Sequence, residues 1–235
     1  MARFLLVHGA AHGAWCWRDT IPALQALGHV ARAIDLPGHG ADTTPLGQVT
    51  LDRYADAVLD ALDAPAVVVG HSMGGYPISV AAERAPDRIA RLVYLCAYVP
   101  WSGLSLAEMR REAPTQPLVP AIRRNDDGVS MHFDPAMAPD LFYHDCTDAS
   151  VAFALANLCD QPLAPMQTPA PLGNAYASVP RSYIVCEDDR AIPPALQHRM
   201  AADFAPEDRH SMNTSHSPFL SDPTALAALL NRIAG

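Results

Sequence analysis

Short apolar runs alternate with segments of helical periodicity along most of this chain. Such alternation leaves few architectures open, because a strand, a helix and a further strand form the repeating unit of a parallel sheet. We expect six strands, at residues 3–7, 30–34, 66–69, 89–97, 182–186 and 208–212. Helices are expected between them, at residues 17–27, 51–62, 73–84, 194–204 and 223–234. The sequence therefore predicts an α/β fold with a six-stranded, mostly parallel sheet flanked by helices.

The alternation is interrupted between residues 100 and 179. Proline divides this stretch into short pieces, some with helical spacing, for example residues 104–112 and 150–158. A structureless loop of this length is uncommon in a compact domain. We therefore expect residues 1–99 and 180–235 to form the core domain, and residues 100–179 to form a helical lid inserted after the fourth strand.

Composition excludes several classes of protein. Half of the residues are hydrophobic and 17% are charged, which excludes a disordered chain. No apolar run approaches the roughly 20 residues that cross a bilayer. The formal net charge of −9, without a long basic run, argues against a nucleic-acid partner. All 16 basic residues are arginine, so Schiff-base chemistry and Ser–Lys dyads are excluded as well.

The cysteines predict free thiols rather than disulfides or a metal site. They are odd in number and scattered, without zinc-ligand spacing: Cys16, Cys96, Cys146, Cys159 and Cys186. The apolar run at residues 4–7 is too short for the core of a signal peptide. We therefore expect a cytoplasmic protein, a monomer or homodimer, that contacts neither nucleic acid nor a membrane.

A Gly-x-Ser-x-Gly pattern lies between the third expected strand and the following helix. It consists of Gly70, His71, Ser72, Met73 and Gly74. A nucleophile on a tight strand-to-helix turn takes a strained backbone conformation, so its near neighbours must lack bulky side chains. The helix N-terminus adds positive potential and free N–H groups. The pattern indicates that Ser72 is a nucleophile; the alternative is an ordinary glycine-rich turn with a solvent-facing serine.

A serine nucleophile requires a histidine base, and in this architecture the order along the chain is Ser, then Asp or Glu, then His. Three histidines follow the late acidic cluster. His198 is expected on the surface of a helix, and His210 within the last strand. His216 lies in the loop after that strand, at the sheet edge that also carries Ser72. We therefore expect His216 to be the base.

The acid that orients this base is expected at the end of the fifth strand, where Glu187, Asp188 and Asp189 follow one another. Asp189 begins a loop that leads directly into a helix, and we favour it over Asp188, with Glu187 third. The neighbouring carboxylates could cap that helix or be solvated.

A tetrahedral intermediate needs two backbone N–H donors. Met73, the residue after the nucleophile, is expected to supply one, and Ala10 the other, because Gly9 lets the loop after the first strand approach. His8 and His12 border this loop and could form a second catalytic pair or a metal site. Since neither has a carboxylate nearby in sequence, we expect loop-orienting hydrogen bonds instead.

Several stretches together carry a specific resemblance: residues 4–17, the turn around Ser72, residues 183–193 and His216. They resemble the plant methylesterase and hydroxynitrile-lyase branch of the α/β-hydrolase superfamily and its bacterial carboxylesterase relatives. The resemblance implies the α/β-hydrolase fold and a triad of Ser72, Asp189 and His216. It also implies oxyanion donors at Ala10 and Met73. We expect the reaction to use neither a cofactor nor a metal.

The lyases of this branch typically carry Thr after the first histidine and Lys after the catalytic histidine. This chain has Gly9 and Ser217 at those positions, so a lyase is not expected. The features together predict a serine carboxylesterase that hydrolyses small to medium carboxylic esters through an acyl-serine intermediate. The same groups could serve a lactonase, a pyrethroid-type ester hydrolase or a C–C bond hydrolase. A non-catalytic ligand receptor is the alternative outside the enzymes.

Substrate choice is expected to lie with the lid. The candidate substrate contacts are His12, Trp101, Phe142 and Tyr143. The arginine pairs at residues 110–111 and 123–124 could bind an acidic substrate, but we expect ordinary exposed arginines there. The polar run at residues 125–128 predicts a turn.

Overall fold

The computed structural model describes residues 1–101 and 103–235, and its centre is a six-stranded sheet in which every neighbouring pair of strands is parallel. The strands are β1 (Arg3–Val7), β2 (Val30–Ile34), β3 (Ala66–His71), β4 (Ile89–Leu95), β8 (Arg181–Cys186) and β9 (Arg209–Met212). Their order in the sheet is β2-β1-β3-β4-β8-β9. The α/β fold and the six-stranded parallel sheet predicted from the sequence are confirmed.

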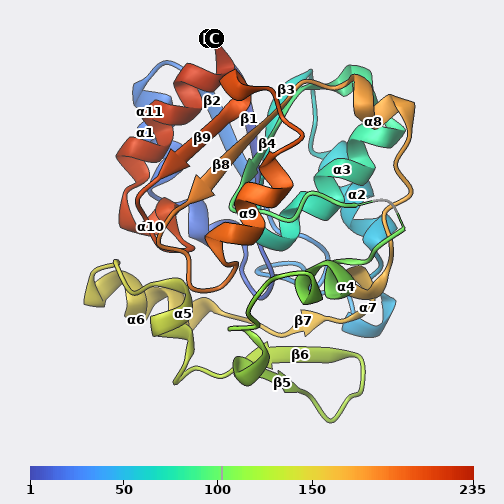
Figure 1. Cartoon of the computed structure of the whole chain (residues 1–235), viewed down its shortest axis with the longest axis vertical. Helices are drawn as coiled ribbons and strands as arrows, with labels where there is room; N and C mark the ends of the chain where they lie inside the picture. Colours follow the sequence, from blue (N-terminus) through green and yellow to red (C-terminus); the bar gives the residue numbers. More distant parts are fainter. Residues whose placement is uncertain (102) are drawn as a thin grey trace.

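Helices cover both faces of this sheet (Figure 1). One face packs against α1 (Thr20–Ala26) and α11 (Pro223–Ala234), and the other against α2 (Leu51–Asp60), α3 (Gly75–Arg84), α8 (Asn174–Ser178) and α9 (Pro194–Ala201). Side chains alternate between the two layers along a strand, so Phe4 faces one core and Leu5 the other. Because both faces are buried at the centre of the sheet, β1 and β3 are almost continuously apolar, whereas the edge strands β2 and β9 are more polar.

The ends of several helices and strands are set by local hydrogen bonds and backbone angles. Thr50 accepts a hydrogen bond from the Arg53 N–H at the start of α2, as a helix N-cap does. The helix expected at 73–84 begins with a 3₁₀ turn, Ser72–Gly74, before α3. The fourth strand stops at Leu95 rather than at residue 97, because Cys96 takes a φ of +36° that turns the chain out of the sheet.

The insertion is not purely helical, which corrects the sequence-based expectation. It contains α4 (Leu106–Arg111), α5 (Ala138–Phe142), α6 (Asp148–Asn157) and α7 (Ala164–Gln167), and its last helix, α8, packs on the core sheet instead. It also contains an antiparallel sheet of β5 (Ile122–Arg124), β6 (Ser130–Phe133) and β7 (Gln161–Pro162). The turn predicted at residues 125–128 joins β5 to β6, and Gly128 has a φ of +73° there.

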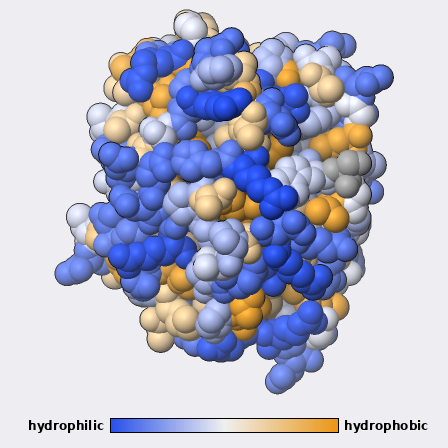
Figure 2. All heavy atoms as spheres, viewed as in Figure 1, coloured by the Kyte–Doolittle hydropathy of each residue, from blue (hydrophilic) through white to orange (hydrophobic). Residues whose placement is uncertain are grey.

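The insertion lies beyond one end of the central sheet (Figure 1). Figure 2 shows polar side chains over most of the viewed face, with apolar side chains in small separate groups. Within residues 1–101 and 103–235, every helix is too short or too polar to span a bilayer.

Gly75, at the start of α3, allows the helix to meet the backbone that follows β4. A Cβ atom at Gly75 would lie 2.0 Å from the carbonyl oxygen of Tyr98. We therefore expect Gly75→Ala to lower the free energy of unfolding by about 1–3 kcal/mol, as overpacking of a buried site does. Urea unfolding measures the change. Gly47→Ala is the control, because the nearest atoms to its Cβ are side-chain carbons of Val129 at 3.9 Å. Equal stability of the two variants would contradict the prediction.

Candidate active site

Ser72 lies at the sharp turn between β3 and α3, and its φ is +54°. This left-handed conformation is strained for a residue with a side chain. Gly70 and Gly74, on either side of this turn, have no room for a side chain. A Cβ at Gly70 would lie 2.7 Å from the carbonyl oxygen of Gly74, and a Cβ at Gly74 would lie 2.8 Å from that of His8. The strained conformation of Ser72 is therefore held by close backbone contacts on both sides of the turn, which only glycine at positions 70 and 74 allows.

His216 and Asp189 meet at the same edge of the sheet, in the loops after β9 and β8. The two side chains are buried, and Nδ1 of His216 lies 2.6 Å from Oδ2 of Asp189. The same oxygen accepts a hydrogen bond from Nε2 of Gln197 at 2.8 Å. Oδ1 accepts the backbone N–H groups of Ala191 and Ile192 at 2.7 and 2.9 Å. Because an ionised carboxylate only accepts hydrogen bonds, Nδ1 of His216 is the donor, which leaves Nε2 free to take a proton.

The alternatives weighed from the sequence lie elsewhere. Asp188 is exposed. Glu187 contacts His198 on the surface, with 3.0 Å between Oε2 and Nε2. His210 is on β9, as expected.

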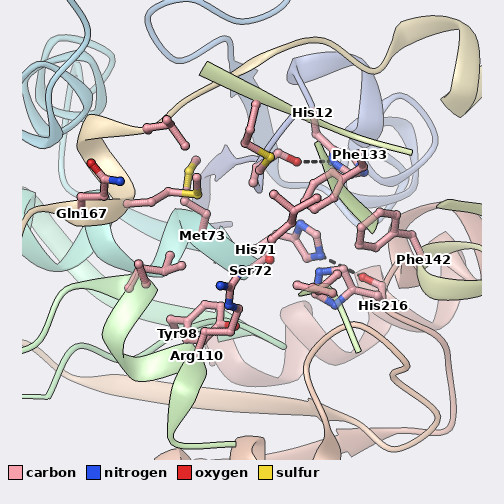
Figure 3. Close-up of a pocket in the computed structure, with 18 of the residues that line it drawn as sticks. His12, His71, Ser72, Met73, Tyr98, Arg110, Phe133, Phe142, Gln167 and His216 are labelled. Atoms are coloured by element: carbon pink, nitrogen blue, oxygen red, sulfur yellow. Dashed lines mark hydrogen bonds between the residues drawn. The ribbon is translucent and has the colours of Figure 1, made fainter. Parts of the chain in front are cut away.

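Ser72 and His216 line one cavity of about 210 Å³ (Figure 3). In the described part of the chain, no hydrogen bond joins the Ser72 hydroxyl to His216. Catalytic hydrogen bonds are often long before substrate binds, so the arrangement is compatible with proton transfer between them.

Ala10 and Met73 also line this cavity. The loop that carries Ala10 touches the turn, since a Cβ at Gly9 would lie 2.8 Å from Cβ of Ser72. Among the described residues, no hydrogen bond occupies the backbone N–H of Ala10 or of Met73. Both N–H groups are therefore available to an anion formed next to Ser72.

His8 and His12 hold this loop rather than forming a second site. His8 donates from Nδ1 to the Gly9 carbonyl at 2.8 Å and accepts the Leu36 N–H at 3.0 Å. His12 donates from Nδ1 to the Ala10 carbonyl and accepts the Tyr143 hydroxyl, both at 2.8 Å. Burial lowers the pKa of His8 well below its ordinary value and that of His12 to about 4. Both rings are neutral, with all four nitrogens in use, so neither is offered to a metal.

Of the four substrate contacts expected from the sequence, two line the cavity and two do not. Phe142 and the His12 ring line the cavity, although no polar atom of His12 remains for a substrate. Tyr143 is buried behind the cavity wall, and its hydroxyl is hydrogen-bonded to His12. The guanidinium of Arg199 packs over the Trp101 ring, 4.5 Å from the ring centroid. Neither Trp101 nor Tyr143 lines this cavity, in contrast to Phe142 and His12. The other apolar wall residues are Leu106, Leu118, Ile122, Met131, Phe133, Leu163 and Met166.

Two glutamines at the site were not found from the sequence. Gln197, on α9, fixes Asp189. Gln161, on β7, accepts hydrogen bonds at Oε1 from the Ala11 N–H and from Nε2 of His39, both at 3.0 Å. Ala11 itself has a φ of +59°. Neither glutamine is part of a recognisable sequence motif, so their contacts could be identified only in the structure.

Comparison with known proteins agrees with this architecture. A model described as "Alpha/beta hydrolase family" matches residues 4–229. Putative methylesterase 11, chloroplastic, of Arabidopsis thaliana is 33% identical over 98% of this chain, which spans 63% of that protein's length. Methylesterase 1 of the same plant is 32% identical over 98% of this chain and 95% of its own length. The crystal structure of a pyrethroid hydrolase from Sphingobium faniae JZ-2 has a TM-score of 0.88 and 28% identity, covering 99% of this chain and 97% of that one.

The buried histidines predict a loss of stability in mild acid. Burial lowers the pKa of His8, His12, His39 and His71 from their ordinary value of 6.5. Below that value the unfolded chain takes up a proton on each, whereas the folded chain keeps them neutral. The free energy of unfolding should therefore fall by about 1.4 kcal/mol per pH unit for each histidine that stays neutral.

Urea unfolding at several values between about pH 6.5 and 5.5 measures this slope, above the range where carboxylates titrate. In a folded His12→Gln variant the slope should fall by one histidine's share, because burial lowers the pKa of His12 to about 4 and keeps it neutral over this range. A free energy of unfolding that stays constant over this range in the unsubstituted protein would contradict the prediction.

Proposed function

This chain belongs to the alpha/beta hydrolase family and is an ester hydrolase, and we propose that it cleaves small to medium carboxylic esters through an acyl-Ser72 intermediate. One observation carries the proposal. The buried contact of 2.6 Å between Asp189 and His216 lies beside a serine with a left-handed backbone, on the wall of one apolar cavity.

In the first half of the reaction, Nε2 of His216 takes the proton of the Ser72 hydroxyl while Oγ attacks the ester carbonyl carbon. The carbonyl oxygen becomes an anion that accepts hydrogen bonds from the N–H groups of Ala10 and Met73. The intermediate collapses, the bond to the alcohol breaks, and His216 returns the proton to the leaving alcohol. An acyl-Ser72 ester remains.

In the second half, His216 takes a proton from water, whose oxygen attacks the acyl carbon. The acid leaves, and Ser72 regains its proton from His216. Asp189 accepts the Nδ1–H throughout and stabilises the imidazolium that forms twice in each cycle. Its hydrogen bonds from Gln197, Ala191 and Ile192 keep the carboxylate from turning away. No step of this route uses a metal or a cofactor.

A pyrethroid-type ester is the second candidate substrate. The support for it is the likeness to the pyrethroid hydrolase structure over nearly the whole chain. Phe133 and Phe142 on the cavity wall would suit its aromatic groups.

Ser72→Ala should remove hydrolysis of p-nitrophenyl butyrate, because no other nucleophile is expected to replace Oγ. Loss of one member of a comparable triad costs on the order of 10⁴- to 10⁶-fold in kcat. Circular dichroism and urea unfolding verify that the variant is folded. Ser178→Ala, on the exposed side of α8, is the matched control and should keep its activity. More than a few per cent of activity remaining in folded Ser72→Ala would overturn the mechanism.

Asp189→Asn should lower kcat far more than it raises KM, because an amide in place of the carboxylate disturbs the tautomer and orientation of His216. The expected loss in kcat is on the order of 10⁴-fold. The neighbouring variant Asp188→Asn makes the same chemical change on an exposed side chain and should retain activity. The reverse result, with Asp188→Asn inactive and Asp189→Asn active, would assign the acid to Asp188.

A further inference from the structure

The cavity next to Ser72 has a charge opposite to that of the protein. The whole chain has a formal net charge of −9, with 25 acidic and 16 basic residues. Three arginines, Arg110, Arg111 and Arg124, line the cavity, and none of its lining residues is an aspartate or glutamate. The sequence predicted ordinary exposed arginines here; Arg111 and Arg124 are exposed, whereas Arg110 is half-buried, and all three line the cavity.

These arginines lack the carboxylate partners that others in the chain have. Arg123 pairs with Asp134 at 2.7 Å, and Arg199 with Glu112 at 3.7 Å. Within the described residues, no ion pair engages Arg110, Arg111 or Arg124. The remaining acid of α4, Glu108, is exposed, and its Oε2 accepts hydrogen bonds from the backbone N–H and hydroxyl of Ser105.

Arg110 differs from the other two in its burial. Its side chain is half-buried, and its Nε atom is buried without a hydrogen-bond acceptor among the described residues. Figure 3 shows the side chain lying beside Tyr98 on the Ser72 side of the cavity. A buried guanidinium donor without an acceptor destabilises the folded chain, so its presence calls for an explanation. An arginine whose methylene stem merely covers apolar surface keeps its guanidinium in water, so simple packing does not explain the buried Nε of Arg110.

We propose that the substrate is an ester that also carries a carboxylate, and that this second group pairs with Arg110. Arg111 and Arg124 line the same cavity and add positive potential there. The proposal rests on the proposed function, since it assumes that Ser72 attacks the ester. Monoesters of dicarboxylic acids are the simplest compounds of this class. A planar guanidinium can donate two parallel hydrogen bonds to a carboxylate, which fixes the orientation of the ester relative to Ser72.

The test compares anionic and neutral esters of matched length. Monomethyl adipate carries the carboxylate on the acyl side and is matched by methyl hexanoate. O-butyrylglycolate carries it on the alcohol side and is matched by ethyl butyrate. We expect kcat/KM to be about 10- to 100-fold higher for one anionic ester than for its neutral partner, the size of a charged hydrogen bond. The pair that shows the preference identifies the side of the ester that carries the carboxylate.

Arg110→Met keeps the length of the stem and removes the charge, and it should remove this preference. Arg110→Lys should restore part of it, because a lysine keeps the charge without the planar fork. Arg123→Gln is the matched control, since it removes one positive charge from β5 at a residue that does not line the cavity, and it should leave the preference unchanged.

Two results would overturn the proposal: equal kcat/KM for both members of both pairs, or an unchanged preference in folded Arg110→Met. Either can occur while Ser72→Ala abolishes hydrolysis, and the proposed function then stands without the anionic substrate. Hydrolysis of these esters that persists in Ser72→Ala would instead overturn the proposed function.

Discussion

The left-handed backbone of Ser72 is kept in place by contacts that only the assembled sheet provides. A residue with a side chain in that conformation costs of order 1–3 kcal/mol. Gly74 lies against the carbonyl of His8, which follows β1, and Gly75 lies against that of Tyr98, which follows β4. The strain at Ser72 is therefore balanced by packing between three neighbouring strands and α3. Because these strands are parallel, the loops that carry Asp189 and His216 arrive at the same edge.

A second set of contacts joins the insertion to the core. His8 and His12 hydrogen-bond the carbonyls of Gly9 and Ala10 and so hold the loop that lines the cavity at Ala10. Tyr143 and Gln161 continue this network from the insertion, by hydrogen bonds to His12 and to the Ala11 N–H. A buried network whose nitrogens are all hydrogen-bonded is rigid, so the loop that carries Ala10 is held in one conformation.

The central sheet was predicted correctly from the sequence, and the structure brings Ser72, Asp189 and His216 to one edge of it, as expected. The turn at Ser72 has a pattern dictated by sterics, and the parallel topology brings the loops after β3, β8 and β9 to the same edge. The small sheet of the insertion was missed because strands of two to four residues are too short to establish a period. The side of α4 that faces the cavity depends on how the insertion packs. For that reason Arg110 was predicted to be exposed, and Trp101 to be on the wall.

The hydrogen bond from the Ala11 N–H to Gln161 bears on how the protein could diverge. An insertion at one end of a sheet looks like a module that recombination could replace as a whole. Here the incoming segment would also need an amide oxygen where Gln161 lies and a hydroxyl where Tyr143 lies, or the loop with Ala10 would lose its support. New substrate ranges are therefore reached more readily by single substitutions along the cavity wall, with the scaffold of the insertion inherited intact.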